Sequence, residues 1–92
     1  MITINQGSKS FYVGDSKVEP LAEMVFTSSD KDIIIIDHTF VSDELRGQNV
    51  GRQLLQKVVD WARTENKKIV PLCPFAKAEM MKNSEYKDVL HQ

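Results

Sequence analysis

The sequence predicts an α/β domain with a mixed sheet, in which early antiparallel strands lead into a parallel pair joined by a helix. Three observations predict this fold: short alternating runs in the first third, four consecutive isoleucines at positions 33–36, and an amphipathic stretch from Val50. The chain has 92 residues, which is the size of one domain, and we expect positions 1–92 to form it.

The first third of the chain reads as short strands separated by turns. Apolar and polar residues alternate near positions 2–4, at 11–13 and at 22–27, which predicts three strands. Ser28, Ser29 and Asp30 are typical of a turn and are expected to end the third strand. Strands so close in sequence favour an antiparallel arrangement.

Residues 33–41 predict a central strand, because four isoleucines in a row suit a strand that is covered on both faces. Apolar side chains then recur at helical spacing and predict a helix from Val50 to near Asn66. Residues 69–72 predict another strand, and strand, helix and strand at this spacing imply a parallel pair with a right-handed crossover. Residues 75–83 predict a second helix.

Pro71 is unusual inside a parallel strand pair, because proline has no N–H to donate to the ladder. We therefore expect the two parallel strands to diverge at this residue. The divergence would open a slot between the ends of the strands at residues 33–41 and 69–72.

Composition excludes several classes of function. The 12 Lys and Arg residues against 13 Asp and Glu give a net charge of −1, which supplies no broad positive field for a nucleic acid. One cysteine, Cys73, and two histidines exclude a disulfide framework and a cysteine-based zinc site, so no metal is expected. No apolar run approaches the ~18 residues of a membrane span. We expect a reducing, cytoplasmic location and no membrane partner.

The connection between the long strand and the following helix predicts an anion site. It places Gly47, Asn49 and Gly51 around the start of the helix, with Arg46 and Arg52 on either side. The first N–H groups of a helix have no internal partner and carry the positive end of its dipole, and glycines let phosphate oxygens approach the backbone. The spacing fits neither a P-loop nor a dinucleotide fingerprint.

Residues 46–55, RGQNVGRQLL, resemble the acyl-CoA pyrophosphate loop of the GNAT superfamily of N-acetyltransferases, which reads Gln/Arg-x-x-Gly-x-Gly/Ala. Arg46 fills the first position of that pattern and Gly51 the last. Asn49 stands at the middle glycine, and asparagine tolerates left-handed backbone angles. The segments HTFV at 38–41 and VPLCPF at 70–75 are similar to a compact single-domain branch of the superfamily.

The resemblance implies a truncated GNAT-like fold with acetyl-CoA as its cofactor and transfer of an acetyl group to an amine. It implies contacts of Phe40 and Val41 with the pantetheine arm and the thioester. The residues expected at the pyrophosphate of coenzyme A, through backbone amides or positive charge, are Arg46, Gly47, Gln48, Asn49, Val50, Gly51 and Arg52.

Two residues are candidates for the chemistry. In the compact branch the residue equivalent to Cys73 is the proposed catalytic one, so this thiol would accept the acetyl group or exchange protons. His38 suits a general base. Each also has a structural interpretation, because a lone cysteine is often a small buried hydrophobe and His38 shares strand parity with Ile34 and Ile36.

The acceptor is not identified by the sequence, and small polyamines, peptide amino termini and protein lysines all fit. The oligomeric state is equally open. An alternative function is a non-catalytic coenzyme A-binding or regulatory module, because the chain lacks the segments that usually frame the acceptor. A purely structural interaction domain is a third interpretation.

Overall fold

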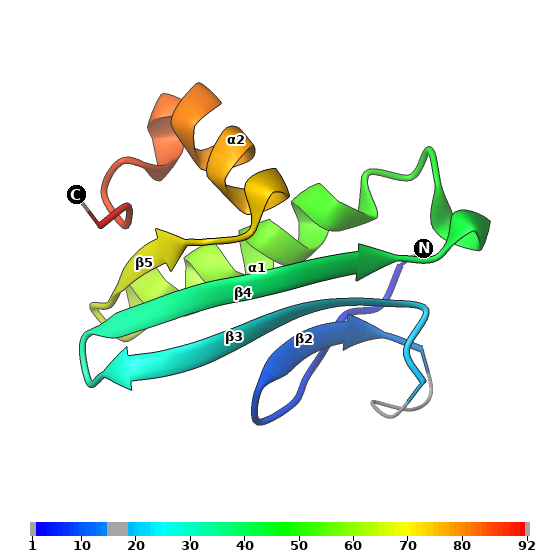
Figure 1. Ribbon diagram of the computed structural model, residues 1–92, viewed down its shortest axis with the longest axis horizontal. Helices are drawn as coiled ribbons and strands as arrows, with labels where there is room; N and C mark the ends of the chain where they lie inside the picture. The colour runs from blue at the N-terminus through cyan, green and yellow to red at the C-terminus, as the bar shows by residue number, and fades with distance from the viewer. Residues whose placement is uncertain (1, 15–18, 92) are drawn as a thin grey trace.

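The computed structural model describes residues 2–14 and 19–91, which form a five-stranded sheet and two helices (Figure 1). The elements are β1 (Asn5–Gln6), β2 (Ser10–Val13), β3 (Ala22–Asp30), β4 (Ile33–Val41), α1 (Val50–Thr64), β5 (Lys68–Pro71) and α2 (Pro74–Lys82), with 3-10 turns at Asp43–Leu45 and Ser84–Tyr86. Strands β1 to β4 pair antiparallel in sequence order, and β4 pairs parallel with β5. The predicted α/β class and mixed sheet are confirmed.

Helix α1 covers one face of the sheet, and Figure 1 shows β4 passing in front of it. Trp61 of α1 lies against Phe11 and Phe26, with ring centroids 6.0 and 4.8 Å apart. The buried side chains of α1 recur at helical spacing, as predicted: Val50, Leu54, Leu55, Val58, Val59 and Ala62. The sheet face opposite α1 is called the open face below.

Two of the early strands differ from the expectation. The first strand is Asn5–Gln6 rather than residues 2–4, and Ile2 and Ile4 pack against the core as partly buried side chains outside any strand. Strand β3 continues to Asp30 through the predicted turn. Pairing with the isoleucine-rich start of β4 overrides the turn preference of Ser28 and its neighbours, with a register shift at the end of the strand.

Strand β4 is fully buried on one face only, so the expectation of cover on both faces is wrong. Ile34 and Ile36 are 0% exposed, whereas Ile33 and Ile35 are only half-buried. The right-handed crossover places α1 against a single side of the strand, and that is the side that Ile34 and Ile36 occupy.

A β-bulge interrupts β4 at Asp37. Val25 pairs with His38, but the next residue of β3, Phe26, pairs with Ile36, so Asp37 has no residue opposite it. An extra residue of this kind reverses which face the following side chains occupy.

The bulge moves His38 out of the predicted core. Thr39 pairs with the buried Met24 and so lies on the α1 side of the sheet, while His38 and Phe40 lie on the open face and are exposed. The sequence-based interpretation of His38 as a core residue in phase with Ile36 is therefore wrong, because unbroken alternation does not hold across the bulge.

Strands β4 and β5 pair only over four residues, Ile33–Ile36 with Lys68–Pro71. The carbonyl oxygen of Ile36 then accepts from the N–H groups of both Leu72 and Cys73 at 3.1 Å, and α2 begins at Pro74. In the part of the chain that the structure describes, residues 37–41 of β4 have no strand on this side. We call this opening the β4–β5 fork, and it confirms the predicted divergence at Pro71. None of the described helices is long and apolar enough to cross a membrane.

Candidate active site

The start of α1 presents N–H groups that find no acceptor in the described part of the chain. Asn49 caps the helix with left-handed angles, φ 56° and ψ 33°, and makes no side-chain cap hydrogen bond. Its carbonyl accepts from Gln53 N–H at 3.0 Å. Within residues 2–14 and 19–91, no acceptor contacts the N–H groups of Val50, Gly51 or Arg52. Together with the helix dipole, these groups favour an anion.

The loop before the helix is held by its own backbone. Gln48 N–H points at Leu45 O at 3.4 Å, and Gln48 O accepts from the side-chain amide of Gln53 at 2.9 Å. Gly47 has φ 85°, and a Cβ at this position would meet nothing within 4 Å. The loop therefore leaves the space beside Gly47 open to solvent or to a ligand.

Gly51 is required by packing inside the protein. A Cβ at Gly51 would lie 2.8 Å from the ring of Phe75, in the first turn of α2. The sequence pattern predicts that a glycine here lets a phosphate approach the backbone, and the structure shows that its Cβ position faces Phe75. The first turns of α1 and α2 thus pack directly against one another.

Both arginines of the loop have carboxylate partners. Arg46 Nε lies 2.9 Å from Asp43 Oδ1, and both side chains are exposed. Arg52 Nε lies 3.9 Å from Oε2 of Glu79, whose side chain is only 11% exposed and also accepts from Asn83 Nδ2 at 3.2 Å. Nothing in the sequence indicates that Glu79 of α2 reaches the first turn of α1, so this contact could not be predicted.

Backbone groups of β4 line the fork on one side. Ser42 N–H donates to Leu21 O at 2.7 Å, on the β3 side of the strand. Because the N–H groups of successive strand residues alternate between the two edges, the N–H of Val41 lies on the fork side. The backbone of Phe40 faces β3 by the same alternation, and its side chain is 45% exposed on the open face.

Cys73 lies at the closed end of the fork, where it caps α2. The residue is 4% exposed, and its thiol donates to Thr39 Oγ1 at 3.2 Å. Thr39 was not predicted as a site residue. The bulge that turns it toward Cys73 leaves no recognisable pattern in the sequence.

His38 lies on the other side of the same strand. Its side chain is 60% exposed, and Nε2 lies 3.8 Å from Oε1 of Glu23 on β3. The His38 side chain lies on the open face of β4, whereas Cys73 contacts Thr39 on the α1 side of the strand. Among the described contacts, His38 and Cys73 therefore have no neighbour in common. The structure thus brings Cys73 to Thr39 and His38 to Glu23.

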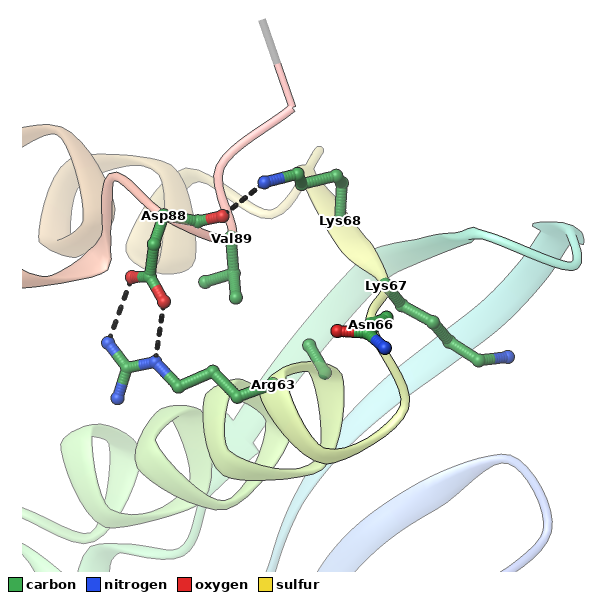
Figure 2. Close-up of a pocket in the computed structure, with 7 residues that line it drawn as sticks. Arg63, Asn66, Lys67, Lys68, Asp88 and Val89 are labelled. Atoms are coloured by element: carbon green, nitrogen blue, oxygen red, sulfur yellow. Dashed lines mark hydrogen bonds and ion pairs between the residues drawn. The ribbon is translucent and has the colours of Figure 1, made fainter.

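A separate pocket lies at the other end of α1 (Figure 2). The Arg63 guanidinium donates to both carboxylate oxygens of Asp88, at 2.9 and 3.0 Å, and Lys68 Nζ donates to the Asp88 carbonyl. The hydrogen bond from Arg63 lowers the pKa of Asp88 and raises that of Arg63. Since these cations already have acceptors, we assign the cluster to holding the C-terminal segment against α1 and β5. Among the described residues, no group of His, Cys, Asp and Glu is arranged to hold a metal.

A mixed sheet whose parallel strands fork beside a helix start with unpaired N–H groups is the arrangement expected of an N-acetyltransferase. The family model of the GCN5-related N-acetyl-transferases matches residues 10–89, and the chain belongs to this family. A GCN5-like protein from Staphylococcus aureus, assigned as an N-acetyltransferase and determined by NMR in solution, is similar in structure with a TM-score of 0.83. The two are 47% identical, over 98% of this chain and 88% of that chain. The comparison with curated proteins finds no significant match.

Proposed function

We propose that this N-acetyltransferase binds acetyl-CoA at the start of α1 and in the β4–β5 fork, and acetylates an amine. One observation carries the proposal: free N–H groups at Val50, Gly51 and Arg52 lie beside a strand edge that has no partner in the described chain. A diphosphate needs the first feature, and an extended arm with amide groups needs the second.

The loop supplies charge as well as donors. The N–H groups of the first turn would bind pyrophosphate oxygens, and Arg46 and Arg52 would neutralise part of their charge. Arg46 is available because its exposed pair with Asp43 is worth little in water. Arg52 is held near the helix start by the buried Glu79 at 3.9 Å.

The fork orients the reacting group. The N–H of Val41 is suited to pair with the pantetheine arm or the thioester carbonyl, and such donors stabilise negative charge that develops on the oxygen. Acetyl-CoA supplies the acetyl group as an activated thioester. The exposed side chain of Phe40 borders the fork on the open face.

Direct attack by the amine fits the placement of the two candidate side chains. The amine nitrogen bonds to the acetyl carbon while the carbon–sulfur bond breaks. His38 on the open face takes the proton from nitrogen, and the thiol of Cys73 gives one to the departing sulfur. Proton donation needs only that the thiol hydrogen turn from Thr39 Oγ1 to the departing sulfur. A route through an acetylated Cys73 would also need room for an acetyl group on a residue that is 4% exposed, so the burial favours direct attack.

Coenzyme A binding is the first test. A ligand at about 100 times its dissociation constant stabilises the folded state by about 2.7 kcal/mol, which corresponds to a rise in Tm of roughly 10–20 °C. We expect the shift to shrink in Arg52→Gln and to persist in Lys57→Gln, which removes an exposed cation elsewhere on α1. No shift at millimolar coenzyme A would contradict the proposal.

Catalysis is tested by thiol release that depends on an added amine. Cys73→Ala should lower kcat by about 10²-fold, the usual effect of losing a proton donor, and Cys73→Ser should restore part of it. An acetyl group trapped on Cys73 in quenched reactions would contradict direct attack. Coenzyme A binding without amine-dependent thiol release would identify a non-catalytic binding module.

A further inference from the structure

We propose that Glu23 binds the ammonium group of the acceptor, and that the acceptor is an aliphatic primary amine. The inference rests on the proposed acetyl transfer and concerns the open face beside the β4–β5 fork. It assigns a recognition role to a residue that does not itself touch the thioester.

Glu23 is a partly buried carboxylate without a permanent cation. Its side chain is 24% exposed, and its Oε1 lies 3.8 Å from Nε2 of His38, an imidazole that carries charge only when protonated. Among the described residues, no lysine or arginine lies within ion-pair distance of Glu23. A carboxylate that has lost part of its water without gaining a fixed partner favours a cation from outside.

Apolar and aromatic surface borders Glu23 as well, since Tyr12 of β2 and Phe40 of β4 are its cross-strand neighbours. Phe40 pairs with Glu23 across the two strands and is 45% exposed. Leu72, which follows the last residue of β5 across the fork, is 62% exposed. A hydrocarbon chain with a terminal ammonium matches this combination, because the methylenes contact the apolar side chains and the charge meets the carboxylate and the face of the Phe40 ring.

The pair of Glu23 and His38 also suits the proton transfer. An acceptor held at Glu23 lies beside His38. The ammonium loses one proton to water before its nitrogen attacks, and His38 takes the second proton as the carbon–nitrogen bond forms. The imidazolium that results remains 3.8 Å from Glu23, which stabilises its charge. The carboxylate next to His38 on β4, that of Asp37, already has a donor, since its Oδ2 accepts from Thr27 Oγ1 at 2.5 Å.

The test is an NMR titration of the labelled protein with n-butylamine at neutral pH, with and without coenzyme A. We expect saturable shifts at Glu23, His38 and Phe40. Glu23→Gln should weaken the dissociation constant about tenfold, which is 1.4 kcal/mol, and Phe40→Leu should weaken it severalfold. Glu65→Gln removes an exposed carboxylate at the end of α1 and should change nothing.

Equal affinity of wild type and Glu23→Gln, or shifts confined to another surface, would overturn the inference. The titration needs no turnover, so it stands apart from the thermal and kinetic tests of acetyl transfer. An amino-terminally blocked lysine peptide in place of butylamine distinguishes a protein acceptor from a free amine. In turnover assays, Glu23→Gln should raise KM for butylamine and leave KM for acetyl-CoA unchanged.

Discussion

Cys73 Sγ and Thr39 Oγ1 lie 3.2 Å apart across the β4–β5 fork and join the cap of α2 to the unpaired half of β4. The contact depends on the bulge at Asp37, which turns Thr39 to the side on which Cys73 is buried. The direction of the thiol is therefore set by β4, the strand whose unpaired edge forms one side of the fork.

Thr39→Val tests this relationship. Valine keeps the shape of threonine and removes the oxygen that accepts the thiol hydrogen, so the thiol loses its fixed direction. We expect kcat to fall about tenfold, with the Kd of coenzyme A within about twofold of wild type. Thr64→Val is the matched control, because its hydroxyl contacts only Asp60 O at 3.0 Å on the exposed end of α1. An unchanged kcat in Thr39→Val would show that the hydrogen bond between Cys73 and Thr39 does not contribute to catalysis.

The features that sequence predicts well are those that leave a local pattern. Pro71 cannot donate a hydrogen bond to the strand ladder, so the sequence predicts the residue at which the fork begins. The helical spacing of apolar residues from Val50 predicts which side chains of α1 are buried. Asn49 was expected to tolerate left-handed angles and adopts φ 56°.

The features that could not be predicted depend on pairing and packing between distant segments. A single extra residue at Asp37 exchanged the faces of His38 and Thr39, and no propensity marks such a bulge. The contacts of Gly51 with Phe75 and of Arg52 with Glu79 arise only when α2 packs beside α1. The Gly51–Phe75 contact explains by helix packing why this residue is a glycine, while the role of its N–H at the pyrophosphate stays a prediction.

Gly51→Ala should destabilise the protein by about 1 kcal/mol, because the new methyl would lie 2.8 Å from the Phe75 ring. For a domain of this size the loss lowers Tm by roughly 4–8 °C, measured by thermal unfolding. Combining it with Phe75→Leu should recover part of the loss, since the smaller side chain clears the methyl. A stability of Gly51→Ala equal to wild type would show that the ring moves aside without cost.

The Arg63–Asp88 pair should make stability depend on acid pH. The pKa of Asp88 is lowered in the folded state by the hydrogen bond from Arg63, so its contribution is fully present above the ordinary carboxylate pKa and is lost as pH falls through the folded value. Urea midpoints of wild type and Asp88→Asn should therefore differ at neutral pH and converge as pH is lowered below the ordinary carboxylate pKa. Glu44→Gln, at an exposed carboxylate, should leave the pH dependence unchanged. A difference in urea midpoint that stays constant as pH falls would show that the ion pair of Arg63 and Asp88 does not cause the pH dependence.

Asn49 and Asn66 adopt the same left-handed conformation at the two ends of α1, with φ 56° and 57°. Comparing variants of the two residues therefore distinguishes an effect of backbone strain from an effect on ligand binding. Alanine tolerates these angles poorly, so Asn49→Ala and Asn66→Ala should each cost about 1 kcal/mol in urea unfolding. Asn49 makes no side-chain cap hydrogen bond, so Asn49→Gly should cost little. Only changes at Asn49 should alter the Kd of coenzyme A, because only this residue precedes the free N–H groups. Equal effects of both alanine variants on that Kd would place the binding site elsewhere.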